Sequence, residues 1–249
     1  MTIPLASVGF KVFSTEEAMQ LATVVAQRGE RVGTALGSYM VLKTGTRSQL
    51  WAKLDEENRP YSISPHYEGD SRNPVLLAQR IKYNNKPLDG RYLAWMNPNG
   101  NTPGFGPPGE YTIIFECPNF AFYNFVDIPC NVTVQLAAAA REVSLYNTVE
   151  EYNNKQDKIC PVGSVIGSSA NAGATPAYLP EAYICGVVER TQVFENPFTH
   201  YYFQWALVRV GKVQFDVCID AATLDIPMVA GGVVAGDFHL SGQLILDGA

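Results

Sequence analysis

Residues 131–145 read NVTVQLAAAAREVSL, and the structure of this segment decides the fold class of the middle of the chain. The four alanines favour a helix, but apolar residues occupy every even position up to Ala140. Side chains that alternate in this way point to one face of a strand. After Arg141 the apolar positions become odd, at Val143 and Leu145, as one extra residue in a bulge would cause. The segment therefore predicts one long strand with a bulge.

The flanking sequence also favours strands. Aromatic residues make up 11% of the chain, and its 21 glycines and 16 prolines suit many short strands joined by turns. Two capping boxes, at residues 14–17 and 148–151, predict helices, and the first helix should end at Gly29. We therefore expect a mainly β protein with a few short helices.

The chain divides into two β-rich parts on composition. Residues 1–159 predict a β-rich N-terminal domain with one N-terminal helix, and residues 160–180 predict a linker rich in Gly, Ser, Ala and Pro. Residues 181–249 alternate strands with glycine-marked corners, which is typical of a small OB-like Greek-key barrel. No internal repeat of sequence links the two halves.

The C-terminal half also contains four specific sequence motifs. It contains E-R-T at 189–191, P-F-T at 197–199, G-x-V-x-F-D-V at 211–217 and G-G-V-V-x-G-x-F-x-L-S-G-x-L at 231–244. With these motifs, the C-terminal half resembles an uncharacterised family of bacterial, largely cyanobacterial, proteins with an OB-like β-barrel. The resemblance implies a two-part cytosolic architecture and supplies no function or catalytic residue.

Charge and cysteine usage point to the cytoplasm. The formal net charge is −6, which argues against a general nucleic-acid binder and against attachment to anionic lipid. The first fifteen residues lack the pattern of a secretory signal, and no apolar run is long enough to span a membrane. The five cysteines lie mostly in apolar strand-like runs, where reduced thiols are expected.

One polar segment offers candidates for acid–base catalysis. His66 lies close in sequence to three charged residues, which are Glu68, Asp70 and Arg72. A histidine beside carboxylates could serve as an acid–base group. A solvated loop whose charges pair at the surface explains the same residues. We therefore treat these four only as candidates, and assign no catalytic residue.

A second group consists of aromatic residues and histidines. The candidate binding residues are Phe198, His200, Tyr202 and His239, because exposed aromatic side chains on an OB-like barrel can stack on ligands. Alternation along residues 201–205 places Phe203 and Trp205 inward together with Tyr201, and places Tyr202 and Gln204 outward. Packing in the core explains the inward residues equally well.

Motifs for metals, cofactors and phosphates are absent from the sequence. The three histidines show no metal-ligand spacing, and no phosphate-binding loop, dinucleotide fingerprint or nucleophile elbow occurs. We therefore expect no metal and no cofactor. Asp216 and Asp220 share one strand face, which we expect to point to water, and Arg190 is a candidate ion-pair partner for Asp216.

Three functions remain open. The first is a non-enzymatic binding or assembly module whose partner is another protein or a second copy of this chain. The alternative is an enzyme with a site around His66 at the junction of the two parts. The third is a single-strand nucleic-acid binder, which the charge disfavours because residues 160–249 carry three basic and eight acidic residues. We expect neither a nucleic-acid nor a membrane partner.

Overall fold

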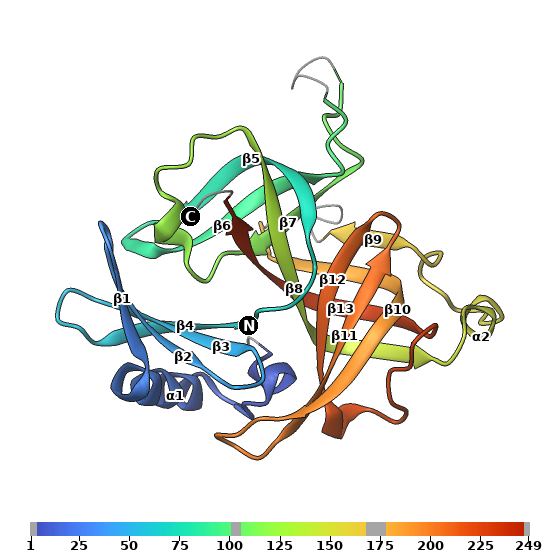
Figure 1. The fold of residues 1–249 in the computed structure, drawn as a ribbon, viewed down its shortest axis with the longest axis horizontal. Helices are drawn as coiled ribbons and strands as arrows, with labels where there is room; N and C mark the ends of the chain where they lie inside the picture. Colours follow the sequence, from blue (N-terminus) through green and yellow to red (C-terminus); the bar gives the residue numbers. More distant parts are fainter. Residues whose placement is uncertain (1–3, 101–105, 168–177, 247–249) are drawn as a thin grey trace.

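A computed structural model describes residues 4–100, 106–167 and 178–246 (Figure 1). These residues are mainly in β-strands, which confirms the expected fold class. The helical elements are η1 (Leu5–Val8), α1 (Thr15–Arg28), η2 (Phe120–Tyr123), α2 (Val149–Asn153) and η4 (Ala221–Thr223). Both capping boxes are present, because Ser14 and Thr148 accept hydrogen bonds from the amides of Glu17 and Glu151.

The strands form two sheets. The small sheet consists of β1 (Glu30–Thr34), β2 (Gly37–Lys43), β3 (Ser48–Leu54) and β4 (Pro60–Tyr67). The large sheet consists of β5 (Asn73–Tyr83), β6 (Lys86–Met96), β7 (Tyr111–Glu116), β8 (Cys130–Tyr146), β9 (Ser164–Gly167), β10 (Glu181–Glu195), β11 (Tyr202–Val210), β12 (Val213–Asp220) and β13 (Val233–Ile245).

At the centre of the large sheet, β8 pairs antiparallel with β13 along the whole length of β13. We call this pair the shared ribbon, because two rings of strands close on it. Barrel A runs β8, β5, β6, β7, β13 and back to β8, and barrel B runs β8, β12, β11, β10, β13 and back to β8. The single bridge between Glu116 and Ser241 completes barrel A.

The two barrels are built from a structural repeat that the sequence does not reveal. Each half of the large sheet is a three-strand meander followed by one long strand, β5–β6–β7 with β8 and β10–β11–β12 with β13. In each half the first meander strand pairs antiparallel with its own long strand. The last meander strand pairs parallel with the long strand of the other half. The two halves therefore repeat in strand topology, although their sequences show no repeat.

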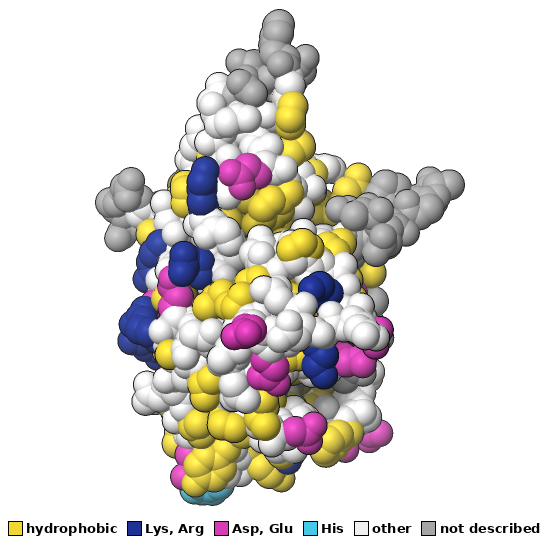
Figure 2. Space-filling model, turned by 90° about the vertical axis from the view of Figure 1, so that its right-hand side faces the viewer, with side chains coloured by type: hydrophobic (Ala, Val, Ile, Leu, Met, Phe, Trp, Pro, Cys, Tyr) yellow, Lys and Arg dark blue, Asp and Glu magenta, His cyan; other side chains and the backbone are white. Residues whose placement is uncertain are grey.

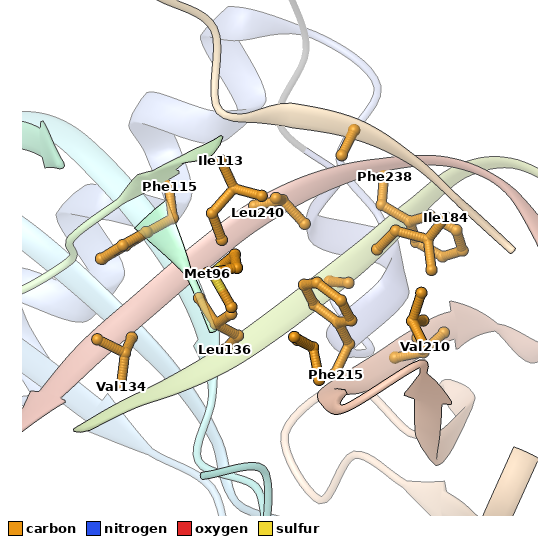
Figure 3. Packing of buried hydrophobic residues seen from close by; sticks show 14 of the residues in the cluster. Met96, Ile113, Phe115, Val134, Leu136, Ile184, Val210, Phe215, Phe238 and Leu240 are labelled. Carbon is orange, nitrogen blue, oxygen red and sulfur yellow. The ribbon is translucent and has the colours of Figure 1, made fainter. Parts of the chain in front are cut away.

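Both barrels fill their interiors from the shared ribbon. Leu136 of β8 and Leu240 of β13 lie in one continuous buried cluster (Figure 3). Barrel A adds side chains such as Phe115 and Met96, and barrel B adds others such as Phe215, Ile184 and Val210. The two barrels therefore share one core instead of having one each.

The expected bulge in β8 is confirmed. Ala140 pairs with Phe238 and Glu142 pairs with Asp237, so Arg141 is the extra residue. Beyond the bulge, Val143 and Leu145 turn back to the core. The extra residue thus keeps one face of a 17-residue strand apolar across both barrels.

The small sheet lies between α1 and the barrels (Figure 1). One face packs Leu42 and Leu50 against Ala22 and Val25 of α1. The other face packs large side chains such as Tyr39 and Trp51 against Leu88 of β6 and against η2. The small sheet and α1 therefore form an additional layer on the double barrel.

Part of the expected division of the chain lies outside the described residues. Residues 168–177 of the expected linker are not described, while Ser164–Gly167 before them form β9 on the edge of β10. Residues 181–249 supply four strands of barrel B, and β8 supplies the fifth. An OB-like barrel made by residues 181–249 alone is therefore not confirmed.

Two further findings concern membrane-spanning helices and the cysteines. Within the described ranges, no helix is long and apolar enough to cross a bilayer. All five cysteines are free thiols, four of them buried and Cys130 half-buried.

The bulge gives a direct test of the shared ribbon. Inserting one alanine after Arg141 should turn Val143 and Leu145 to the opposite face and lower the free energy of unfolding by about 2 kcal/mol, because two partly buried aliphatic side chains leave the core. Arg141→Ala keeps the bulge and removes only the ion pair with Glu181, so it should cost at most about 1 kcal/mol. Urea unfolding measures both, and equal losses would contradict the shared-ribbon account.

Candidate functional site

The four candidate catalytic residues lie at the end of β4 and just after it, but they do not converge. His66 is buried, with 1% of its surface exposed, and its Nδ1 lies 2.9 Å from Oγ of Ser241. Its Nε2 has no hydrogen-bond partner among the described residues. Burial lowers the pKa of His66 to about 4, and the side chain of Gln135 opposes this shift only in part. The imidazole is therefore neutral at pH 7.

The other three candidates point elsewhere. Glu68 accepts a hydrogen bond from the Gln49 side chain. Asp70 forms ion pairs with Arg47 at 2.8 Å and with Arg190 at 3.2 Å. The Arg72 guanidinium donates to backbone carbonyls of its own loop. None of these contacts joins the side chain to His66.

A cluster around Lys53 is the main charged site of the interior. Its ammonium is fully buried and contacts Asp89 of β6, Glu116 of β7 at 3.2 Å and Ser64 of β4 at 2.6 Å. Glu116 also contacts Nε2 of His239 at 3.2 Å, and Ser64 donates to it. The candidate binding residue His239 therefore belongs to this interior cluster.

The charges of this cluster hold one another in the ionised state. Burial opposes the charge on Lys53, but Glu116 and Asp89 outweigh it and raise the pKa of the ammonium above its usual value. Burial likewise opposes the charge on Glu116, but Lys53 and the hydrogen bond from His239 outweigh it and hold its pKa well below the usual range. Lys53 is thus a fixed cation in the interior and cannot act as a base near pH 7.

A second buried carboxylate, Asp216 of β12, anchors the chain that follows β4. It accepts hydrogen bonds from the amides of Asp70 and Ser71, from Gln135 and from the Trp205 indole, at 2.7–3.0 Å. A side chain at Gly69 would collide with this carboxylate, so glycine is required there. The expectation that Asp216 faces water is wrong, and Arg190 pairs with Asp70 instead.

These groups line the interface between the small sheet and the shared ribbon. We call this set of residues the polar layer. It contains Gln49, Lys53, Ser64, His66, Glu116, Gln135, Asp216, His239, Ser241 and Gln243. A cavity of about 10 Å³ beside His66, His239 and Ser241 has room for at most one water molecule. No three His, Cys, Asp or Glu residues in the described ranges could hold a metal ion. The polar layer therefore has the properties of a structural interface.

The remaining candidates come together on the hairpin between β10 and β11. Phe198, Tyr201 and Tyr202 expose 46%, 43% and 53% of their surfaces, and Val193 is also exposed. We call these four residues the hairpin patch. Figure 2 shows hydrophobic side chains gathered at the lower end of the molecule beside an exposed histidine. The candidates Phe198, His200 and Tyr202 thus share one surface, which His239 does not join.

The backbone under the hairpin patch is firmly anchored. The buried side chain of Asn196 donates to the Val8 carbonyl and accepts from the Phe198 amide. Thr199 donates to the Gly9 carbonyl at 2.6 Å. On the outer side, Glu195 accepts a hydrogen bond from the Tyr202 hydroxyl and contacts the ring of His200. The aromatic side chains are therefore presented on a preorganised loop.

Two of the orientations expected from alternation are wrong, those of Tyr201 and Gln204. Tyr201 is exposed because β11 begins only at Tyr202, so the alternation does not reach it. Gln204, expected outward, is buried, because the N-terminal segment and the barrel core cover both faces of β11. Lys11 lies with its ammonium 4.6 Å from the centre of the Tyr201 ring, a contact between residues 190 positions apart that no local pattern signals.

Comparisons with known proteins bring no assignment: no family model, no curated protein and no solved structure matches the chain. The resemblance of the C-terminal half to an uncharacterised bacterial family therefore stays a prediction.

Lys53 provides the first test of the polar layer. Lys53→Met should lower the free energy of unfolding by about 3–5 kcal/mol, because it leaves the carboxylates of Asp89 and Glu116 buried without a counter-charge. Lys212→Met, which removes an exposed ion pair with Glu110, is the matched control and should cost less than about 1 kcal/mol. A loss in Lys53→Met no larger than in the control, measured by chemical unfolding, would show that the cluster is not buried as described.

His66 provides a pH-dependent test. The pKa of His66 in the folded state, about 4, lies below the ordinary value of 6.5. As the pH is lowered below 6.5, the unfolded state therefore binds the proton first, and the free energy of unfolding decreases. Between pH 7 and pH 5 the wild type should lose about 2 kcal/mol more than His66→Gln. Glu116 contributes little in this range, because its lowered pKa costs stability only near and below the unfolded value of about 4.3.

The exposed histidine provides the control for this measurement. His200→Gln removes an exposed histidine instead of the buried one, and its loss between pH 7 and pH 5 is compared with that of His66→Gln. Urea unfolding at both pH values measures all three proteins. Parallel losses in the wild type and His66→Gln would rule out a neutral buried imidazole.

Proposed function

We propose that the protein is a non-enzymatic binding and assembly module that contacts a protein partner through the hairpin patch. The observation that carries this proposal is the combination of exposure and anchoring. Phe198, Tyr201 and Tyr202 stay about half-exposed, although Asn196 and Thr199 fix the loop beneath them. Aromatic side chains on rigid backbone lose little conformational freedom on binding and are typical centres of protein interfaces.

The position of the hairpin in barrel B adds support. We propose that both barrels are OB-like, because each joins a three-strand meander to the shared ribbon through one parallel and one antiparallel contact. In such a barrel the loop between the first two meander strands is a common ligand-binding loop, and β10–β11 occupies this place. Fold alone assigns no function, so the exposed side chains carry the argument.

The two alternative functions have less support. An enzyme around His66 would need an open site, whereas His66 is buried beside a cavity that admits one water molecule. A single-strand nucleic-acid binder would need several basic groups near the aromatic side chains, whereas among the described residues only Lys11 is found over a ring of the hairpin patch. The hairpin patch suits a protein surface better than a phosphate backbone.

Site-specific photo-crosslinking in the natural host tests the proposal. A photoreactive phenylalanine analogue at Tyr202 should give at least one discrete crosslinked protein, identified by mass spectrometry, because the side chain lies in the contact. The same analogue at Phe125, which is 73% exposed and lies away from the hairpin, is the matched control. Discrete adducts from Tyr202 that are absent at Phe125 are expected. No adduct from Tyr202, or the same adducts from both positions, would overturn the proposal.

A further inference from the structure

A groove with both apolar and charged walls lies on a different part of the molecule from the hairpin patch. The turns that join β1 to β2, β3 to β4 and β5 to β6 meet at the left of Figure 1 and enclose a pocket of about 470 Å³. Its lining includes Leu36, Leu54, Tyr61 and Pro87. The volume lies in the range of pockets that accept small ligands, so the groove can accept an aromatic side chain.

One residue of the groove is unusual for its position. Leu36 occupies the two-residue turn between Thr34 and Gly37, yet it is an exposed leucine. Such turns favour Gly, Asn and Asp, because a polar or small side chain suits solvent. Leu36 therefore adds an apolar side chain to the lining of the groove, although the turn itself does not require one.

The charges around the two surfaces are complementary. The lining of the groove holds three acidic residues, Asp55, Glu56 and Glu57, against one cation, Lys86. Among the acidic residues, Glu56 forms none of the ion pairs found among the described residues. Lys11 lies over the Tyr201 ring of the hairpin patch and likewise forms none of these ion pairs. A contact between the two surfaces would bring the unpaired cation and the unpaired anion together at its rim.

We infer that the hairpin patch of one copy docks into the groove of a second copy, so that the chain assembles head to tail. This inference rests on the proposed function and names the partner as this chain itself. The aromatic side chains supply the apolar anchor, the groove supplies the socket, and Lys11 approaches Glu56. Because the two surfaces differ, a head-to-tail dimer still has one free hairpin patch and one free groove, so the assembly continues beyond a dimer.

Complementing variants test the inference. Leu36→Glu blocks the groove with a charge, and Phe198→Ala with Tyr202→Ala removes the anchor; all three side chains are exposed, so the fold is retained. Sedimentation velocity from about 1 to 200 µM covers the range in which a micromolar contact is populated. The wild type should form species larger than a dimer, and each variant alone should stay monomeric.

The decisive sample is the equimolar mixture of the two variants. Only one productive contact remains in it, so it should form a 1:1 dimer and nothing larger. A wild type that stays monomeric, or a mixture that stays monomeric, overturns the inference. Assembly of Leu36→Glu like the wild type overturns it in favour of contact between two hairpin patches. Crosslinking from Tyr202 to another protein would still support the proposed function in each of these cases.

Reversing the charges of Glu56 and Lys11 in the same mixture tests whether these two residues face each other at the rim of the contact. Glu56→Lys in the copy that supplies the groove should weaken the dimer about three- to tenfold at low salt, and so should Lys11→Glu in the copy that supplies the patch. Combining both changes should restore the dimer, because the opposite charges meet again. Failure of the combination to restore it would show that these two residues do not face each other.

Discussion

The antiparallel pairing of β8 with β13 is the constraint on which the rest of the structure depends. A sheet edge left open is exposed to wrong pairing, and each meander of the large sheet ends on an edge that only the other half can cover. The last strand of the first meander, β7, needs β13, and the last strand of the second, β12, needs β8. Neither half can close alone, so both bury their apolar faces in one core. Gly242 meets this demand locally, because a side chain there would collide with Phe115 of barrel A.

The outer face of the shared ribbon explains the buried charges. Glu116, Ser241, Ala137 and Asp216 lie side by side across β7, β13, β8 and β12, so the two acidic residues occupy matching places in the two repeats. The chain stabilises them differently. Glu116 has a cation, Lys53, whereas Asp216 has four neutral donors. Each set of partners comes in part from the small sheet or from the chain that follows it. Buried charge that is satisfied in only one arrangement thus fixes how the small sheet sits on the barrels.

The sequence predicts what local periodicity encodes and misses what depends on distant partners. The long strand over residues 131–145 and its bulge are readable, because alternation and its phase shift are local. The sharing of that strand by two barrels is not, since the pairing joins residues about a hundred positions apart and the repeats differ in sequence. The same limit applies to the sites. Polar residues near His66 suggested an exposed cluster, but burial under the ribbon depends on β13. The exposure of Tyr202 was predictable from alternation, whereas that of Tyr201 depended on where β11 begins.

The anchoring of the hairpin bears on how copies of the chain would be arranged. Asn196 and Thr199 tie the hairpin to Val8 and Gly9, which lead directly into α1, and α1 packs on the small sheet whose turns form the groove. The hairpin patch and the groove are therefore linked through packed elements instead of a flexible connection. A head-to-tail contact between rigidly linked surfaces repeats one rotation and one translation at every step. That operation alone would decide whether the copies close into a ring or extend as a filament, so in the proposed assembly its form would depend on the short anchored segment between η1 and α1.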